Sequence, residues 1–306
     1  MFRIGIDLGG TKIEGVVLDE EAIRLRPEKL DFDATSLFRK RVETQQEKGY
    51  GHILNRIHGL YDELAAHIRH QPHSFGIGAP GVVSPRTGLM KNSNTLCLIG
   101  RPLKADLERM LGRKIEIQND ANCFAMAEAL HGAGRGKHLV FGVILGTGCG
   151  GGIVHRGEVI TGPQAIAGEW GHMSIHPDGP LCYCGQRGFV ETYISGGGAE
   201  ARYTEQFGGK CSFKEIARDY YADEPKAVAF MKDFLRRFGR SLANLIDVLD
   251  PDVVVLGGGV SNFDALYTEG VAEVAKQVFS DHLETPIVKH QLGDSAGVFG
   301  AALIGV

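Results

Sequence analysis

The run FRIGIDLGGTKIEGVVLD, residues 2–19, decides the fold of this chain. Two apolar segments flank a GGTK tip, a pattern that predicts a β-hairpin with glycines at its turn. A second run, LVFGVILGTGCGGGIVHRGEVI at residues 139–160, repeats the plan with a glycine-rich tip at 146–152. Two half-molecules that open with the same hairpin indicate an internal duplication.

Glycine-rich tips of this kind can bind phosphate, because glycine permits positive φ and leaves backbone N–H groups open to an anion. The alternative is a pair of tight hairpin turns. Two tips with Gly-Thr at matching places, one followed by Lys12, favour phosphate binding, and the absence of Walker A spacing excludes a P-loop enzyme. A third glycine turn at 257–259 follows an apolar strand at 252–256; it could receive a nucleotide or serve close packing alone.

The octapeptide IEIQNDAN, residues 115–122, joins a short apolar strand to a helix between the two repeats. Polar side chains at such junctions lie at the carboxyl rim of a sheet, where open α/β sheets bind ligands. Asp120 is therefore a candidate catalytic carboxylate. The competing interpretation is that Asn119 or Asp120 caps the helix and does no chemistry.

Length and composition limit the class of protein. With 306 residues the chain can form two domains and a large core, and its 43 glycines exceed the usual share of about 7%. The net charge of −4, with both signs interspersed, gives no footprint for nucleic acid or an anionic membrane. The six scattered cysteines do not form a disulfide framework, and no signal peptide or membrane span is recognisable, which predicts a cytoplasmic protein.

Periodicity predicts the remaining elements. A polar segment at 31–50 is expected to be a surface loop, and 161–198 is loop-rich with a dense cluster of reactive side chains. Helices are predicted at 51–70, 103–111, 121–130, much of 210–249, from about Asn262, and over the small residues from 294 onwards, and strands at 74–79 and 287–290.

Further motifs stand between the two ends of the chain: GAPG at 78–81, NDAN at 119–122, GEWGH at 168–172, CYCG at 182–185 and GVFGAA at 297–302. With the hairpins, in this order, they resemble the ROK family of sugar kinases and repressors within the actin-like ATPase superfamily. The resemblance implies an α/β fold with two actin-like (ribonuclease H-like) domains, mixed β-sheets flanked by helices, around a central cleft. The implied domains are 1–120 and 121–293, the second with a sugar and zinc loop insert at 161–198, while the helix at about 294–306 packs back on the first.

The resemblance also implies ATP, Mg²⁺ and a hexose as ligands. Asp120 would be the base that accepts the proton of the sugar hydroxyl while its oxygen attacks the γ-phosphoryl group. Asp7 and Thr11 match positions near Mg²⁺ and the phosphates, and for Lys12 a phosphate contact and a solvated surface lysine stay open. The implied sugar contacts are Gly81, Asn94, Asn119, Asp120, Glu169, His172 and Glu191. The implied nucleotide contacts are Gly5, Asp7, Gly9, Gly10, Thr11, Lys12, Gly146, Thr147, Gly148, Gly150, Gly151, Gly257, Gly258 and Gly259.

The family's zinc site departs from its usual pattern in this chain. Members commonly bind zinc through the histidine of the Gly-His pair and three cysteines in the run C-x-C-G-x-x-G-C, whereas the third cysteine here is Phe189. His172, Cys182 and Cys184 remain as expected ligands, which leaves a fourth place open. A water, His176 or Asp178 could fill it, or Phe189 could pack in place of the metal; zinc is the preferred expectation.

The expected activity is that of an ATP-dependent hexokinase acting on the 6-hydroxyl of a free hexose, with fructose or mannose as the first choice. N-acetylglucosamine kinases and glucokinases share most of the motifs and are the alternatives. The family often places a tryptophan near Asn94, whereas this chain reads TLCL at 95–98, so this pocket wall is expected to differ. A homodimer is implied by the resemblance alone. A sugar-sensing regulator or a silent sugar-binding protein is the alternative of another class, although the ATP-loop strand starts at residue 2 and no basic recognition helix is visible.

Overall fold

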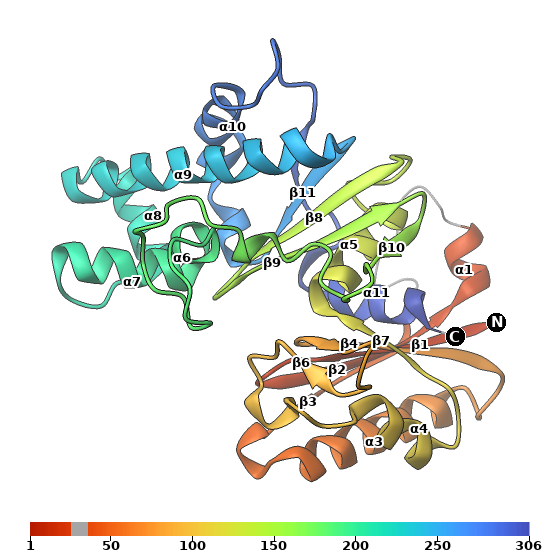
Figure 1. Ribbon diagram of the computed structural model, residues 1–306. Coiled ribbons are helices and arrows are strands. Elements are labelled where there is room, and N and C mark those ends of the chain that lie inside the picture. The colour runs from red at the N-terminus through yellow and green to blue at the C-terminus, as the bar shows by residue number, and fades with distance from the viewer. Residues whose placement is uncertain (26–35, 306) are drawn as a thin grey trace. The chain divides into compact units, whose positions relative to one another are not determined.

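The computed structural model describes residues 1–25 and 36–305 of the chain (Figure 1). Internal contacts divide it into two compact units, one formed by residues 1–136, 152–167 and 291–306 and the other by 137–151 and 168–290. This division assigns the helix at 120–131 to the first unit, whereas the sequence placed 121–293 in the second domain.

The first unit is built on a sheet with strand order β3-β2-β1-β4-β7. The N-terminal hairpin pairs β1 with β2 antiparallel, while β4 and β7 continue the sheet in parallel. Its strands are β1 (Phe2–Leu8), β2 (Lys12–Asp19), β3 (Ser36–Glu43), β4 (His73–Ala79) and β7 (Glu116–Asn119), with a small ribbon of β5 (Val82–Val83) and β6 (Met90–Lys91). Residues 36–43 therefore form an edge strand, and the prediction of a loop there is wrong; residues 31–35 of that prediction lie outside the described part.

Helices cover both faces of this sheet, as Figure 1 shows. The amphipathic helix α3 (Tyr50–His67) buries Ile53, Ile57 and Leu64 in a core shared with the sheet. The small-residue helix α11 lies on the other face, where an added Cβ at Gly5 would come within 2.5 Å of the backbone of Ala302. The unit's helices are α1 (Glu20–Leu25), α3, α4 (Leu103–Leu111), α5 (Asp120–His131) and α11 (Ala296–Ile304), with short turns η1 (Gln46–Lys48), η2 (Leu96–Leu98) and η6 (Gly293–Ser295).

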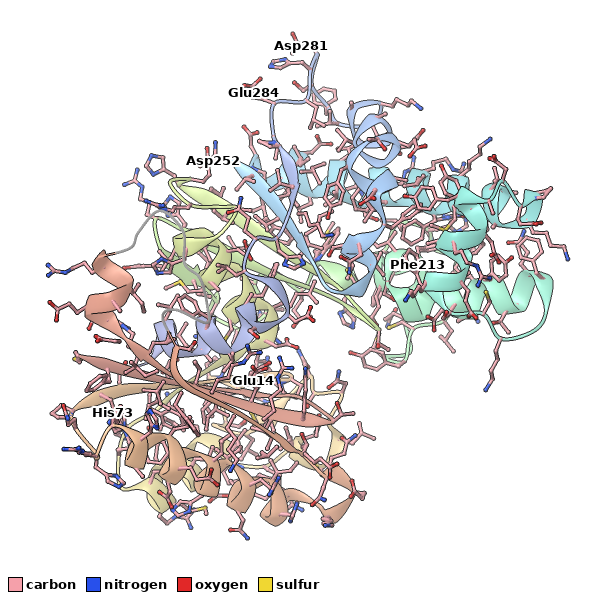
Figure 2. The ribbon with its side chains drawn as sticks, turned by 180° about the vertical axis from the view of Figure 1, so that it is seen from behind. Glu14, His73, Phe213, Asp252, Asp281 and Glu284 are labelled. Atoms are coloured by element: carbon pink, nitrogen blue, oxygen red, sulfur yellow. The ribbon has the colours of Figure 1, made fainter. Side chains whose placement is uncertain are left out.

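A buried carboxylate locks the edge strand to the rest of the first unit. Glu14 in β2 is 3% exposed and pairs with Arg39 and, at 2.9 Å, with Arg41, both on β3 (Figure 2). Arg39 also donates a hydrogen bond to Ser295, just before α11. The charges in the polar segment 36–43 thus have partners that local sequence does not reveal.

A second sheet repeats the first topology, with strand order β10-β9-β8-β11-β12. Here again an antiparallel meander is continued by two parallel strands. The strands are β8 (Leu139–Leu145), β9 (Cys149–His155), β10 (Glu158–Ile160), β11 (Val253–Gly257) and β12 (Ile287–Lys289). The predicted glycine loop 146–152 is shorter than expected, since its residues from 149 onwards belong to β9.

The second unit carries most of the remaining helices. Helix α9 buries Phe234, Phe238 and Leu242 and packs against α8 and α10. The glycine turn after β11 leads into two short turns and then α10, so the single helix predicted from about Asn262 is wrong. The elements are η3 (Trp170–His172), α6 (Glu191–Ile194), α7 (Gly196–Phe207), α8 (Phe213–Tyr221), α9 (Pro225–Leu249), η4 (Gly259–Asn262), η5 (Asp264–Tyr267) and α10 (Glu269–Ala275). Asp281 and Glu284 lie at the tip of the segment between α10 and β12 (Figure 2).

No helix in the described ranges 1–25 and 36–305 is long and apolar enough to cross a membrane.

Candidate active site

Asp120 stands at the carboxyl end of β7, where the strand meets helix α5. The cap of that helix is Asn119, whose Oδ1 accepts a hydrogen bond from the backbone N–H of Ala121 at 2.9 Å. Asp120 Oδ1 also accepts from Ala121 N, at 2.8 Å, and its side chain is exposed. Because Asn119 already caps the helix, Asp120 has a solvent-facing carboxylate at the rim of the sheet.

Asp7 lies close to Asp120 within the first unit. Burial, followed by the negative charges of Asp120 and Glu14, raises the pKa of Asp7 to about 7, while Lys12 acts in the opposite direction. An added Cβ at Gly78 or at Gly297 would come within 3.2 Å of the Asp7 carboxyl oxygens. A pair of carboxylates that repel one another in a glycine-lined space suits a bound divalent cation.

The first glycine tip is a turn closed by backbone bonds. Gly9 donates from its N–H to Lys12 O at 2.9 Å, and Thr44 Oγ1 donates to Gly9 O at 2.6 Å. A Cβ at Gly9 would lie 2.8 Å from Lys12 O, so the turn requires glycine, while Gly10 has more room. Thr11 and Lys12 are exposed beside it. Gly5, in contrast, is a packing residue in the middle of β1 under α11.

The second glycine tip forms one end of a pocket of about 890 Å³ in the second unit. The pocket reaches from Gly146 and Thr147 to helix α8, where Phe213 lies (Figure 2). Its lining also contains Gly196, Gly197, Glu200, Ser212, Lys214, Ala217, Arg218, Tyr221, Gly259, Val260, Asn262 and Phe263. A pocket of this size with two glycine turns at one end has room for a nucleotide.

Sequence reasoning missed the far end of this pocket. Lys214, Arg218 and Tyr221 lie on α8, which starts with a capping box made by Ser212 and Glu215. That capping box is visible in the sequence as a helix start, but nothing local shows which face of the helix lines a cavity. Distant contacts alone bring this helix to the glycine loops.

The other predicted nucleotide-contact glycines fall into two groups: those at the turn after β11 and those inside strands. Gly259 has open space around it and lines the pocket, and Gly258 has a φ of +81°, with Leu145 O 2.4 Å from an added Cβ. Gly257 is buried as the last residue of β11. Gly150 and Gly151 lie in β9, where the carbonyl of Gly150 accepts from Trp170 Nε1 at 3.1 Å and a Cβ at Gly151 would lie 2.6 Å from the Trp170 ring.

Glu169, His172 and Glu191 gather in the second unit. Glu169 Oε2 lies 3.5 Å from His172 Nδ1, and the side-chain contact with Glu169, with added negative charge from Glu191, raises the pKa of His172 against the opposing effect of burial. Glu191 Oε2 accepts from Cys149 N at 2.9 Å and lies 2.7 Å from where a Cβ on Gly148 would stand. Carboxylates and an imidazole so arranged can accept and donate hydrogen bonds to vicinal hydroxyls.

The other two predicted sugar contacts belong to the first unit. Gly81 has a φ of +90°, and a Cβ there would lie 2.5 Å from Lys91 O, so the turn between β4 and β5 requires glycine. Asn94 is exposed between two buried residues, Ser93 and Thr95, that hydrogen-bond to one another at 3.1 Å. Both can therefore present polar groups to a ligand.

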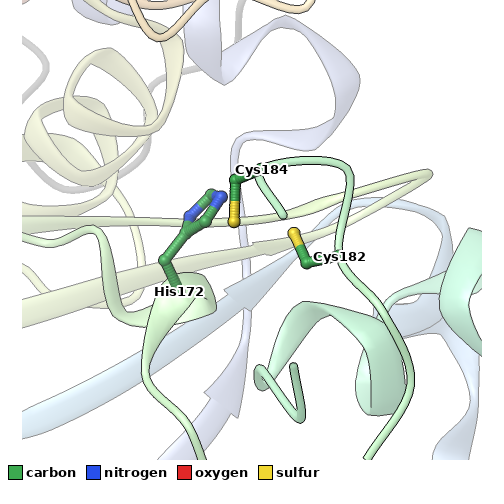
Figure 3. Close-up of side chains that lie close together, drawn as sticks. All are labelled: His172, Cys182 and Cys184. Carbon is green, nitrogen blue, oxygen red and sulfur yellow. The ribbon is translucent and has the colours of Figure 1, made fainter. Parts of the chain in front are cut away.

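His172, Cys182 and Cys184 come together, with their ligand atoms all within 4.8 Å of one another (Figure 3). A turn closed by Cys182 N to Gln186 O at 2.8 Å presents the two thiols. The ring of Phe189 stands edge-on to that of His172 with centroids 5.6 Å apart. The donor set fits a thiophilic metal such as zinc, and among the described residues neither His176 nor Asp178 joins the group as a fourth ligand.

Comparison with known proteins gives a family and several relatives that span nearly the whole chain. The model of the ROK family matches residues 3–305. N-acetyl-D-glucosamine kinase from Yersinia pseudotuberculosis serotype O:1b (strain IP 31758) is 37% identical over 98% of this chain and 97% of its own length. The kinase of the same name from Vibrio atlanticus (strain LGP32) is 38% identical over 99% of both chains.

Solved structures similar to this chain also include members of the ROK family. A ROK hexokinase from Thermus thermophilus has a TM-score of 0.86 and 32% identity, covering 100% of this chain and 98% of that one. A ROK family glucokinase from Streptomyces griseus, in complex with glucose and AMPPNP, has a TM-score of 0.79 and 28% identity over 100% and 99% of the two chains. The predicted fold class, with two mixed sheets flanked by helices, is confirmed. On the family match and the relatives together, this chain belongs to the ROK family.

Proposed function

We propose that the protein is an ATP-dependent sugar kinase that transfers the γ-phosphoryl group to the 6-hydroxyl of a hexose, with N-acetyl-D-glucosamine as the preferred acceptor. The observation that carries the proposal is the exposed carboxylate of Asp120 close to the half-buried carboxyl of Asp7, within the unit that contains the first glycine hairpin. A carboxylate pair of this kind beside a glycine turn suits phosphoryl transfer.

Asp120 accepts the hydroxyl proton of the sugar as the oxygen attacks phosphorus. Phosphoryl transfer depends mainly on alignment and charge neutralisation, so one positioned carboxylate with backbone N–H donors and a cation suffices. The glycine tips at 9–10 and 146–148 offer their N–H groups to the phosphates, and Lys12 offers a positive charge.

Mg²⁺ is the cation that suits Asp7. Burial and the negative charges of Asp120 and Glu14 raise the pKa of Asp7 to about 7, and a divalent ion, when bound, would supply positive charge beside it. Asp7 would then be ionised, and Thr11 would stand beside the phosphates. Bound Mg²⁺ neutralises charge on the phosphate oxygens.

Each unit offers groups for sugar hydroxyls: Gly81, Asn94 and Asn119 in the first unit, and Glu169, His172 and Glu191 in the second. The ionised carboxylates accept hydrogen bonds from hydroxyls, and His172 is oriented by Glu169. A zinc ion held by His172, Cys182 and Cys184 would fix the His172 ring, while Phe189 offers no ligand atom. We also propose a homodimer.

The choice of acceptor follows the relatives. Both kinases compared above carry N-acetyl-D-glucosamine in their names, whereas fructose was the first expectation from the motifs. Fructose stays the second candidate, and glucose the third because the solved glucokinase contains it.

The test is an ADP-release assay with Mg-ATP over N-acetylglucosamine, fructose, mannose, glucose and N-acetylmannosamine. We expect N-acetylglucosamine to give the highest kcat/KM. A higher kcat/KM for fructose would make fructose the preferred acceptor and leave the assignment as a sugar kinase unchanged. Sugar binding without ADP release from any acceptor would favour a silent binder or a sensor and overturn the proposal.

A further inference from the structure

Tyr193 is held between two arginine side chains in the second unit. The guanidinium carbon of Arg237 lies 4.2 Å from the centre of the Tyr193 ring, and that of Arg202 lies 4.9 Å from it. The tyrosine is only 3% exposed. Cation–π contacts strengthen when water is excluded, so this double contact fixes the ring firmly.

Asp233 on α9 holds both arginines in place. Its Oδ2 accepts from Arg237 Nε at 2.9 Å and from Arg202 Nη2 at 2.5 Å. Burial acts to raise the pKa of Asp233, but hydrogen bonds from Arg236, Arg237 and Arg202 outweigh it and hold the pKa at about 2. The carboxylate is therefore ionised at neutral pH, and the arginines are oriented towards Tyr193.

Tyr193 lies at the centre of α6, which has only four residues, Glu191–Ile194. A helix of one turn has little stability of its own, so its orientation must come from tertiary contacts. Before it, Val190 N donates to Met173 O at 2.9 Å; after it, Gly196 N donates to Gly146 O at 2.7 Å. The Tyr193 hydroxyl lies 2.1 Å from where a Cβ on Gly179 would stand, next to the cysteine-bearing loop.

We infer that Asp233, Arg202 and Arg237 form a positioning clamp on Tyr193 that sets the carboxylate of Glu191 for the sugar. The inference rests on the proposed function, in which Glu191 binds the acceptor. Glu191 is two residues before Tyr193 and is itself bonded to the second glycine tip through Cys149 N. The clamp thus acts through Glu191 and does not touch the reacting atoms.

The chain offers a matched control. Arg236 pairs with the other oxygen of Asp233, but its side chain is 64% exposed, and in the described part of the chain the cations over the Tyr193 ring are those of Arg202 and Arg237. Arg237→Ala and Arg236→Ala therefore remove the same charge from the same carboxylate, and only the first removes a contact with the ring.

Trp170 is the only tryptophan in the sequence and follows Glu169 directly, so we expect its fluorescence to change when sugar binds, without turnover. We expect Arg237→Ala to weaken sugar binding and raise the sugar KM by about tenfold, with a smaller rise in the ATP KM and kcat within about twofold. Tyr193→Leu should act in the same direction. Tyr193→Phe, which keeps the ring, should lose less than Tyr193→Leu.

Three results would overturn the clamp: equal sugar affinity in the Arg237→Ala and Arg236→Ala variants, equal rises in the sugar and ATP KM, or a Tyr193→Phe variant as impaired as Tyr193→Leu. If Arg237→Ala does not fold, Arg237→Lys is measured in its place against Arg236→Lys, with the same sugar-specific loss expected. A wild-type protein that shows neither turnover nor a Trp170 response to any sugar would instead contradict the proposed function.

Discussion

The two glycine hairpins share a fold but differ in the chemistry they carry. Around the first tip stand Asp7, Lys12 and Asp120, a set of charges on strand ends of one sheet. The second tip has no charged residue at 146–148; a carboxylate from elsewhere, Glu191, binds it from outside. It opens instead on a pocket of about 890 Å³. Two sheets of the same topology thus carry different features, a cluster of charged side chains at one tip and a large pocket at the other.

Asp120→Asn is the sharpest test of the catalytic role proposed for the charges around the first hairpin. We expect turnover to fall by about 10² to 10⁴, because a general base is lost while the amide keeps the shape. Sugar binding, followed by Trp170 fluorescence, should stay close to that of the wild type.

Asp62→Asn is the control for this variant, since Asp62 is an exposed residue of α3 that pairs with His58 on the same helix. Near-normal turnover in Asp120→Asn would mean that Asp120 is not the general base. The difference in chemistry between the two glycine hairpins would then not hold.

Phe189→Cys tests the metal site of the second half. Supplying the family's missing thiol should close the tetrahedron around His172, Cys182 and Cys184 and raise zinc affinity at least about tenfold. Competition with a chromophoric chelator gives the affinity, and the cobalt form should show four-coordinate visible bands.

Phe189→Ala leaves the ligand set unchanged and serves as the comparison. If Phe189→Cys binds zinc no more tightly than Phe189→Ala, residue 189 is not at the fourth position.

Ala217→Trp tests whether the pocket of the second half holds the nucleotide. Ala217 lines the pocket on α8, so the indole should fill part of it and raise the ATP KM by about tenfold, with little change in sugar binding. Steady-state kinetics with ATP varied at saturating sugar gives the value.

Ala222→Trp places the same side chain at the exposed cap just after α8, outside the pocket lining. An unchanged ATP KM in Ala217→Trp, or an equal rise in both variants, would mean that the nucleotide binds elsewhere.

His131 gives a smaller effect, on the stability of the first half. Burial against Phe299, followed by the positive charges of Arg135 and Arg3, lowers the pKa of His131 to about 4. The unfolded chain therefore takes up the proton first: the stability is complete above pH 6.5 and is lost as the pH falls from 6.5 to about 4. The loss should be on the order of 1–2 kcal/mol, allowing for partial solvent screening.

Thermal unfolding of the wild type and of His131→Gln at pH 7.5 and pH 4.5 measures this contribution of His131 to stability. The difference in melting temperature between the two pH values should shrink in the variant and stay unchanged in His58→Gln, which alters a half-exposed residue of α3. An unchanged pH dependence in His131→Gln would assign the acid sensitivity to other groups.

Local patterns predicted both hairpins, the helix at 103–111 and the strand-to-helix junction at Asp120, because each is a short apolar run with a turn or cap beside it. They did not predict β3, because charged residues dominate SLFRKRVE; in the structure the strand pairs with β2, packs Phe38 and Val42 against the core and places Arg39 and Arg41 on Glu14. The roles of the individual glycines could not be predicted from local sequence either. Gly9 and Gly259 stand at ligand-accessible turns, whereas Gly5 and Gly151 allow close packing, and the sequence alone cannot distinguish the two uses.

The family resemblance supplied what local patterns could not, namely that residues far apart in the chain act together. Even so, the wall of the pocket on α8 and the arginines around Tyr193 were not foreseen. Both depend on which faces of amphipathic helices meet, and hydrophobic periodicity gives a face without giving its neighbour.

The packing of α11 has a consequence for synthesis of the protein. This helix, at 296–304, covers β1 and β4, and the buried carboxylate of Glu128 in α5 accepts hydrogen bonds from the N–H groups of Gln291 and Leu292 just before it. The first unit therefore needs residues that the ribosome delivers after the whole of the second unit. During translation the second unit can complete its fold first, while the first unit waits with an uncovered sheet, exposed to chaperones and proteases.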